Sequence, residues 1–207
     1  MKEFWNNRYQ TETFVYGETP NDFLKEHSHL IPKGKVLCLA EGEGRNAVFL
    51  AKNGYDVTAI DQSETGLAKA ELLAKKHGVS ITIICTDLAD FTFEEDTWSA
   101  IVSIWAHVPP FLRKCLHSQL YPSLIPGGIL ILEAYTKDQL NMPGIGGPPA
   151  EQADLFMSKY DLVDEICPLQ CLRAEEVHRN IQEGTGHQGE SAVVQILAKK
   201  VYKPNCI

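Results

Sequence analysis

The sequence has no cluster of basic residues and no long hydrophobic run. Its 207 residues include 19 Lys and Arg against 27 Asp and Glu, which gives a net charge of −8. Such a chain repels the phosphate backbone of nucleic acids and the anionic surface of a membrane. No segment approaches the roughly 18 apolar residues of a transmembrane helix, and the opening residues MKEFWNNRYQ lack the apolar core of a signal peptide. We therefore expect a cytoplasmic protein that binds neither nucleic acid nor membrane.

Closely spaced cysteine pairs are also missing. The six cysteines stand at 38, 85, 115, 167, 171 and 206, without a C-x-x-C motif. Cys38 and Cys85 fall in strand-like apolar runs, and a metal site on Cys167 and Cys171 would need two further ligands that no spacing supplies. We interpret the cysteines as buried free thiols and predict no metal centre.

What the sequence does contain is an alternation of strand-like and helix-like segments. This alternation is typical of a parallel sheet with helices on its faces. Ser63 is placed to cap the second of the helices. The predicted strands are 35–40, 55–61, 80–87, 98–108 and 129–135, and the predicted helices are 44–54, 64–78 and 111–124.

The two ends of the chain depart from this rhythm. Two long strand-like runs, 169–183 and 190–201, are separated by EGTGHQGE and predict an antiparallel hairpin on one edge of the sheet. We predict one α/β domain of 207 residues with 44% hydrophobic content. Its parts are a helical lid (1–34), a Rossmann-like core (35–135), a Gly/Pro-rich insertion (136–168) and the hairpin (169–207).

A glycine-rich segment, LAEGEGRNA (39–47), follows the first strand and opens the first helix. Open parallel sheets bind ligands at this position, beyond the carboxyl ends of the strands. The pattern Gly42-x-Gly44-x-x-Ala47 fits a nucleotide-binding turn, and Asp61 follows Gly44 by 17 residues. Asp61 is therefore placed to accept hydrogen bonds from both hydroxyls of a ribose.

Carboxylates at this edge decide which nucleoside it favours. Glu41, Glu43, Asp61 and Asp87 follow three neighbouring strands, and each would change the energy of a charge at ~6 Å by roughly 1–3 kcal/mol. They disfavour pyrophosphate and favour a ligand with a sulfonium and an ammonium group, which S-adenosylmethionine has. Asp87 would face the adenine, with Leu88 packed on its ring. For Glu43, a solvent-facing position or a place at the helix N-terminus is the simpler alternative.

Three longer motifs extend this interpretation: WNNRY…FVYGETPNDFL, GEGRNAVFLA and EGTGHQGESAVVQILAKK. With the glycine loop, the ribose acid and the PGG turn, they resemble class I S-adenosylmethionine-dependent methyltransferases. More narrowly, they resemble the tellurite-resistance (TehB-like) family, with thiopurine methyltransferase a more distant comparison. The resemblance implies a seven-stranded sheet with one reversed strand and a cofactor lying over the first two strands.

The resemblance also assigns residues to the cofactor. It implies the methionine moiety on Gly42 and Gly44, the ribose on Asp61, and the adenine near Asp87 and Leu88. The predicted cofactor-binding set is completed by their neighbours Ala40, Glu41, Arg45, Asn46 and Gln62. Two positions depart from the family pattern, because Cys38 replaces an acid and Ala40 replaces the first loop glycine. We hypothesise that Glu41 compensates by binding the methionine ammonium group.

Methyl transfer from a sulfonium needs alignment and exclusion of water more than a dedicated base. Tyr16, His107 and His187 are the candidate catalytic residues on the acceptor side. Each has a simpler alternative. Tyr16 could be an aromatic residue packed in the lid, and His107 a histidine beside Pro109 whose hydrogen bonds are made within the protein. His187 could be a solvated or turn-stabilising residue of the hairpin turn. The Gly/Pro-rich stretch 137–150 is expected to gate the acceptor.

The expected function is therefore methyl transfer from S-adenosylmethionine to a small molecule, with a soft nucleophile such as a thiol or a selenium or tellurium oxyanion as acceptor. Two alternatives stay open. Cys38 and Ala40 leave room for a cofactor-binding module without turnover. An NAD(P)-dependent oxidoreductase is disfavoured by the loop carboxylates, by the 34 residues before the first strand, and by the lack of a Tyr-x-x-x-Lys pair.

Overall fold

Seven strands form one mixed sheet in the computed structural model, which describes residues 2–201. The strand order is β3-β2-β1-β4-β5-β7-β6, and β7 runs antiparallel to both of its neighbours. The predicted, mostly parallel sheet with one reversed strand is thus confirmed. The strands are β1 (Lys35–Leu39), β2 (Asp56–Asp61), β3 (Thr82–Cys85), β4 (Trp98–Ile104), β5 (Leu124–Tyr135), β6 (Gln170–Glu183) and β7 (His187–Lys199).

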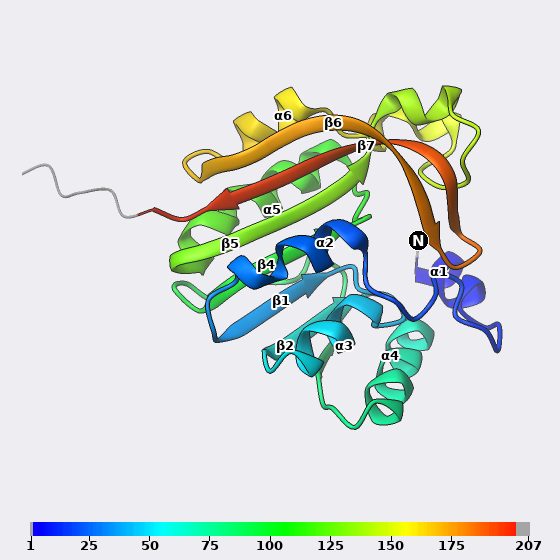
Figure 1. Ribbon diagram of the computed structural model, residues 1–207, viewed down its shortest axis with the longest axis horizontal. Coiled ribbons are helices and arrows are strands. Elements are labelled where there is room, and N and C mark those ends of the chain that lie inside the picture. The colour runs from blue at the N-terminus through cyan, green and yellow to red at the C-terminus, as the bar shows by residue number, and fades with distance from the viewer. Residues whose placement is uncertain (1, 202–207) are drawn as a thin grey trace, which may run out of the picture.

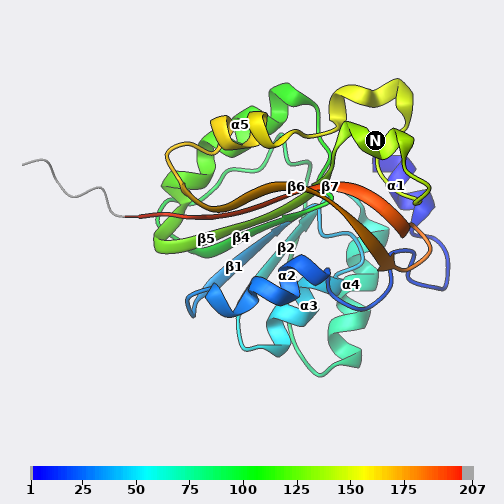
Figure 2. The same ribbon diagram turned by 45° about the horizontal axis from the view of Figure 1, so that its top comes forward.

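Helices cover both faces of the sheet. Helices α2 (Asp22–His27), α3 (Arg45–Lys52) and α4 (Glu64–Lys76) lie on one face, and α5 (Pro110–Ser123) and α6 (Lys159–Glu165) lie on the other (Figure 2). Successive side chains of a strand point to opposite faces. Since both faces are covered, all seven residues of β4 are buried. Ser63 caps α4 as predicted, because its side chain accepts a hydrogen bond from the N–H of Gly66.

The N-terminal residues and the C-terminal hairpin meet at the carboxyl edge of the sheet. Helix α1 (Lys2–Arg8) packs near α4, and the hairpin of β6 and β7 bends over this edge until its tip lies beside the N-terminal residues (Figure 1). The N–H groups of Thr185 and Gly186 both bind the carbonyl of Val15. Three short 3-10 helices complete the described elements, at Ser28–Leu30, Lys137–Asn141 and Ala150–Leu155. Among the described residues, no helix is long and apolar enough to cross a membrane.

The structure moves several of the expected strand boundaries. β3 is Thr82–Cys85, shorter than the predicted 80–87. β4 ends at Ile104, so the prediction of a strand over 98–108 is wrong at its end, and Trp105 and His107 lie in the segment that follows the strand. β5 begins at Leu124, ahead of the predicted 129–135. β7 begins at His187, so the hairpin turn is only 184–186 and the prediction of His187 in the turn is wrong. Glu183 and His187 are instead the last paired residues of the ladder. The glycines of EGTGHQGE suggested a longer turn, but backbone pairing continues to this pair.

The five cysteines in the described residues are free, but most of them are not buried. Cys38 is buried in β1, whereas Cys85, Cys115, Cys167 and Cys171 are exposed. The prediction of a buried thiol is wrong for Cys85 because β3 is an edge strand with a partly exposed surface. Cys206 lies outside the described residues.

Candidate active site

The glycine loop, residues 40–44, joins β1 to α3 at the carboxyl edge. Strand β1 lies between β2 and β4, where the strand order reverses, and open α/β sheets bind ligands at such points. Gly42 and Gly44 have φ angles of 60° and 88°, which favour glycine. Ala40 has a φ of 50° although it carries a side chain. A β-carbon at Gly44 would lie 2.5 Å from Cβ of Ala70, so this glycine lets α4 pack against the loop.

Asp61 ends β2 and faces the glycine loop, as expected. One carboxylate oxygen accepts a hydrogen bond from the N–H of Gly42 at 2.9 Å, and the other from the N–H of Ser63 at 2.8 Å. Burial raises the pKa of Asp61, although these two donors act in the opposite direction. Because each carboxylate oxygen has two lone pairs, Asp61 keeps acceptor capacity for a pair of hydroxyls.

Glu41 turns back toward the helix that follows it. Its Oε1 accepts a hydrogen bond of 2.7 Å from the N–H of Ala47, in the first turn of α3. Burial raises the pKa of Glu41 to about 7, although the Ala47 N–H and the charge of Arg45 lower it. The carboxyl group therefore stabilises the helix N-terminus. Its role toward an ammonium group stays a prediction.

Glu43 does not face water, so its interpretation as a solvated carboxylate is wrong. The residue is 3% exposed, and its Oε1 lies 2.5 Å from Nζ of Lys69 on α4. Its Oε2 accepts a hydrogen bond of 3.2 Å from the N–H of Tyr16. The loop carboxylate thus attaches the N-terminal segment to the glycine loop.

Tyr9 lies directly on the glycine loop and was not singled out from the sequence. A β-carbon at Gly42 would be 2.5 Å from its hydroxyl oxygen, and one at Gly66 would be 2.9 Å from its ring. Tyr9 is 5% exposed and stacks on Trp5 with ring centroids 5.8 Å apart. Burial and the nearby Asp61 raise its pKa, so the phenol is neutral. The signal for such a residue was the aromatic character of an otherwise polar N-terminal stretch.

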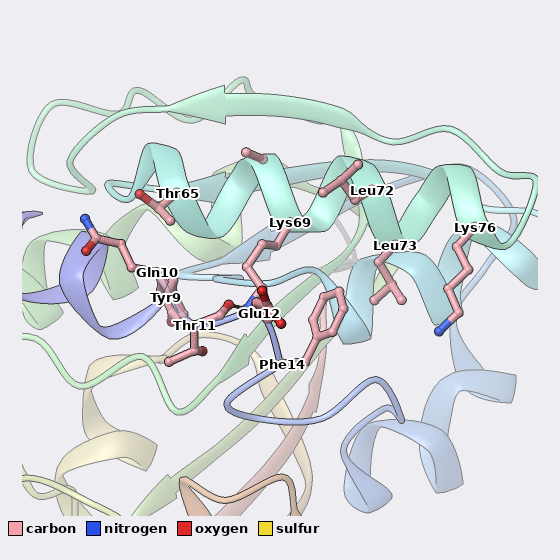
Figure 3. A pocket seen from close by; sticks show the side chains of 11 residues that line it. Tyr9, Gln10, Thr11, Glu12, Phe14, Thr65, Lys69, Leu72, Leu73 and Lys76 are labelled. Carbon is pink, nitrogen blue, oxygen red and sulfur yellow. Dashed lines mark hydrogen bonds between the residues drawn. The ribbon is translucent and has the colours of Figure 1, made fainter.

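Lys69 fastens the residues that follow Tyr9. Its Nζ donates to the carbonyl oxygens of Thr11 (3.1 Å) and Thr13 (2.7 Å) and lies 4.9 Å from the centroid of Phe14. Figure 3 shows Thr11 and Phe14 facing Lys69 of α4. A cleft of ≈ 450 Å³ lies there. The cleft is lined by residues of α4 and by Tyr9, Gln10, Thr11, Glu12 and Phe14, without a strand residue. Tyr9 borders both this cleft and the glycine loop.

The residues expected at the adenine lie one strand further along the sheet. Asp61 pairs with Cys85, which ends β3, so Asp87 comes to the same edge. Asp87 is exposed, and its Oδ1 accepts a hydrogen bond from the N–H of Ala89. Leu88 is 7% exposed and belongs to the main hydrophobic core. Gln62 is half-buried next to Asp61.

A network of buried charges, which was not predicted, lies beside the glycine loop. Glu133 of β5 and Glu183 of β6 are 0% and 2% exposed. Arg179 bridges them, with Nη2 2.7 Å from Glu133 and 3.3 Å from Glu183. Nη2 of Arg45 lies 2.5 Å from Oε2 of Glu183. Nδ2 of Asn21 donates to both carboxylates, so two acids and two arginines join α3, β5, β6 and the N-terminal segment.

Arg45 and Asn46 are therefore engaged with protein groups at the place where the resemblance puts cofactor. Oδ1 of Asn46 accepts the N–H of Asn21 at 2.9 Å. Nη1 of Arg45 is buried without a partner among the described residues. The signal for the network was Glu133, a single acid in the apolar run ILILEAY.

Five rings meet next to this network, and we call Tyr16, Trp105, His107, Tyr135 and His187 the aromatic cluster. The ring centroids of Trp105 and Tyr135 are 4.4 Å apart, and those of Tyr16 and His187 are 4.5 Å apart. Nε1 of Trp105 donates to Oε2 of Glu183 at 2.7 Å. Trp105 has a φ of 60°, a strained conformation of the kind that gathers at functional sites.

The three predicted acceptor-side residues are thus brought together, but they differ in what they can do. His107 binds backbone groups through both nitrogens, accepting the N–H of Tyr135 at Nε2 and donating from Nδ1 to the carbonyl of Leu155. Burial lowers its pKa to about 4, so His107 is neutral and positions β5 against residue 155. Burial raises the pKa of Tyr16. In contrast to His107, His187 makes no hydrogen bond with the described residues through either ring nitrogen, and its Nδ1 is buried.

Comparisons with known proteins agree with this geometry. Residues 36–128 match the family model described as a methyltransferase domain. The chain is 35% identical over 100 residues to the uncharacterized methyltransferase YbaJ of Bacillus subtilis, an alignment covering 47% of this chain and 38% of YbaJ. It is 27% identical over 95 residues to "Probable S-adenosyl-L-methionine-dependent methyltransferase TehB" of Haemophilus influenzae, covering 46% of this chain and 31% of TehB. The matched regions thus span well under half of these relatives.

A solved structure extends the likeness of the fold to almost the whole chain. The N-methyltransferase NodS of Bradyrhizobium japonicum, in complex with S-adenosyl-L-homocysteine, superposes with a TM-score of 0.69. The superposition covers 96% of this chain and 97% of NodS at 14% sequence identity. This likeness shows the fold, and together with the matched domain it argues against an oxidoreductase.

Proposed function

We propose that this chain, which resembles class I S-adenosylmethionine-dependent methyltransferases such as TehB, is such an enzyme and transfers a methyl group to a small-molecule acceptor held in the aromatic cluster. One observation carries this proposal. Arg45, which directly follows the glycine loop, shares Oε2 of Glu183 with Trp105 of the aromatic cluster. The predicted cofactor end and the predicted acceptor end are therefore one side chain apart, at the point where the strand order reverses.

The residues at the glycine loop fit S-adenosylmethionine. Gly42 has a φ of 60° and lets the hydroxyl of Tyr9 approach the loop where a β-carbon would lie. Asp61 beside it offers oxygens to a ribose. Glu41, Glu43 and Asp61 supply negative charge to a cationic ligand, although the pairing of Glu43 with Lys69 reduces its share. When bound, the sulfonium supplies an activated methyl group, and no metal is needed for its transfer.

The protein's own contribution is to exclude water and to hold the acceptor. Tyr9 covers the loop, and Tyr16 closes on His187, so the N-terminal segment lies over both ends of the site. Glycine at 186 allows this closure, because a β-carbon there would overlap the ring of Tyr16. A soft nucleophile, a thiol or a selenium or tellurium oxyanion, is the acceptor class we propose, since such nucleophiles react with a sulfonium once they are aligned and desolvated.

Calorimetry and an acceptor screen test this function. We expect the protein to bind S-adenosylmethionine and S-adenosylhomocysteine, and Asp61→Asn to weaken both at least about 10-fold, because each lost charge-assisted hydrogen bond is worth roughly 1.5–3 kcal/mol. Asp56→Asn, at the exposed opposite end of β2, is the matched control. Glu41→Gln with wild-type affinity would remove the ammonium-binding hypothesis.

Release of S-adenosylhomocysteine is then measured with tellurite, selenite, thiols and small amines. Product with at least one acceptor supports the proposed function. Tight cofactor binding without product from any member of the panel would favour the alternative of a cofactor-binding module without turnover.

A further inference from the structure

Glu183 and His187 face each other across the hairpin of β6 and β7. They are Cα partners in the antiparallel ladder, and Nδ1 of His187 lies 3.6 Å from Oε2 of Glu183. This distance is longer than a hydrogen bond, but catalytic contacts often tighten only when the substrates are bound. The same oxygen is held by Arg45 and Trp105, so the carboxylate has a fixed position beside the ring.

The second nitrogen of His187 is turned away from this carboxylate. Nδ1 faces Glu183 and is buried without a hydrogen-bond partner among the described residues, and Nε2 likewise makes no hydrogen bond with them. The Cδ2 atom, which is bonded to Nε2, lies against Gly146 in the insertion that we expect to cover the acceptor. The free edge of the imidazole therefore points to the acceptor side.

Aromatic side chains surround this edge. The ring centroid of His187 lies 4.5 Å from that of Tyr16, 5.0 Å from that of Trp105 and 5.5 Å from that of Tyr135. The hydroxyl of Tyr135 is buried without a partner among the described residues. Aromatic walls favour contacts with sulfur, and they keep water from a reacting pair.

Charge in the surroundings decides which form of the ring is present. Burial lowers the pKa of His187, while the Glu183 carboxylate raises it. Arg45 of α3 and Arg8 of α1 add to the lowering, and His107 is a neutral neighbour. Burial and the charge of Glu183 raise the pKa of Tyr135, and burial raises that of Tyr16, so both phenols stay neutral. A neutral imidazole with a free Nε2 is ready to take up a proton.

We propose that His187, positioned by Glu183, is the general base that deprotonates a thiol acceptor, which makes proton-bearing sulfur compounds rather than oxyanions the substrate class. This inference rests on the proposed methyltransferase function. A selenium or tellurium oxyanion reacts through a lone pair of the chalcogen atom, which bears no proton, so its methylation needs no base. The pKa of a thiol, ~8.5, is closer to the pKa of an imidazole than is the pKa of an amine, ~10.4.

The step balances as follows. The thiol proton passes to Nε2 of His187 while the sulfur lone pair forms the new bond to the methyl carbon. The bond between that carbon and the donor sulfur breaks, and its electron pair stays on the donor sulfur. The proton on His187 then leaves to solvent, and Glu183 stabilises the transient imidazolium.

The test uses thiols of different acidity with the full chain. His187→Gln should lower kcat for an alkyl thiol at pH 7 about 100-fold, at the lower end of what a general base contributes. The same variant should methylate an acidic aromatic thiol, already ionised at pH 7, at close to the wild-type rate. His77→Gln, on the exposed end of α4, is the control and should match wild type with both thiols.

A second readout needs no cofactor. Nitrogen-15 NMR of the protein alone should show His187 at pH 7 as the neutral tautomer with the proton on Nδ1, and Glu183→Gln should shift that signal. A predominant Nε2–H tautomer would overturn the proposal. So would an equal loss of rate with both thiols, which would indicate a structural role.

The two proposals fail in different ways. A wild-type protein that binds S-adenosylmethionine but methylates no acceptor contradicts the proposed function. An active wild-type protein whose His187→Gln variant keeps full activity on alkyl thiols contradicts only the role of His187.

Discussion

The hydroxyl of Tyr9 lies so close to Gly42 that a β-carbon on this glycine would be 2.5 Å from the phenolic oxygen. The two residues are far apart in sequence, and their contact places the N-terminal segment on the loop expected to bind the cofactor. Any ligand on that loop must therefore lie beside Tyr9 or move it.

Gly42→Ala should weaken S-adenosylhomocysteine binding at least about 10-fold, because the added methyl collides with Tyr9 and imposes a strained φ of 60°. Calorimetry gives the affinity. Gly78→Ala is a close control, since its φ is 67° and a β-carbon there meets no atom within 4 Å. Both variants should lose stability of about 1 kcal/mol or more through backbone strain, but only Gly42→Ala should lose affinity. Equal affinities would show that the loop is not approached by the ligand.

Lys69→Met should release the segment from Thr11 to Tyr16. Lys69 donates two hydrogen bonds to backbone carbonyls of this segment and forms an ion pair with Glu43. Glu43 in turn accepts a hydrogen bond from the N–H of Tyr16. Hydrogen exchange of these amides, measured by mass spectrometry, should accelerate at least about 10-fold, as expected for local opening of a weakly held segment. Lys75→Met, also on α4 and exposed, should leave the exchange rates unchanged. Slow exchange in both variants would mean that Lys69 does not fasten the segment.

Glu41 should make the unfolding free energy depend on pH in a particular window. Burial raises its pKa in the folded state from 4.5 to about 7, so the folded state binds more protons than the unfolded state between these values. Stability should therefore fall as pH rises from 4.5 to 7, and the loss is complete above pH 7. Urea unfolding of wild type and Glu41→Gln at pH 5 and pH 8 measures it.

The variant should lack this component, and its stability relative to wild type should rise by about 1–3 kcal/mol between the two pH values. Glu26→Gln, on the exposed surface of α2, serves as control. A difference between wild type and Glu41→Gln that is the same at both pH values would contradict the raised pKa.

Ala40→Gly should stabilise the protein by up to about 1 kcal/mol, because Ala40 holds a φ of 50° that glycine adopts without strain. Ala51→Gly, inside α3, should instead destabilise by roughly 0.5–1 kcal/mol. Urea denaturation at one pH compares the three proteins. A loss of stability in Ala40→Gly would show that its methyl group packs usefully in the loop.

The core of the fold could be predicted from the sequence because its signals are local. The apolar run of β4, the cap at Ser63 and the acid at Asp61 each follow from residues within one or two turns of chain. The position of Asp61 relative to Gly42 also follows, since parallel strands end at the same edge of a sheet.

The residues that close the site could not be predicted in this way. Tyr9 contacts Gly42, and Arg45 contacts Glu183, across separations that no periodicity encodes. The ion pair between Glu43 and Lys69 could not be predicted either. Lys69 stands on a helix, where a lysine is ordinarily expected to be exposed to solvent. His187 was misplaced because glycines at 184, 186 and 189 suggested a long turn, whereas the glycines at 184 and 186 allow close packing of residues 15–17.

The contact between Val15 and the turn at 185–186 sets an order for biosynthesis. The glycine loop, Asp61 and α4 are synthesised before β6 and β7, yet residues 15–17, which lie over the site, pack on the hairpin that these two strands form. Until β6 and β7 have emerged and paired, Tyr16 has no His187 to close on, and Arg45 has no Glu183. A nascent chain can therefore hold Tyr9 on the glycine loop before the hairpin is made, but it completes the contacts of Tyr16 and Arg45 only when β6 and β7 have paired.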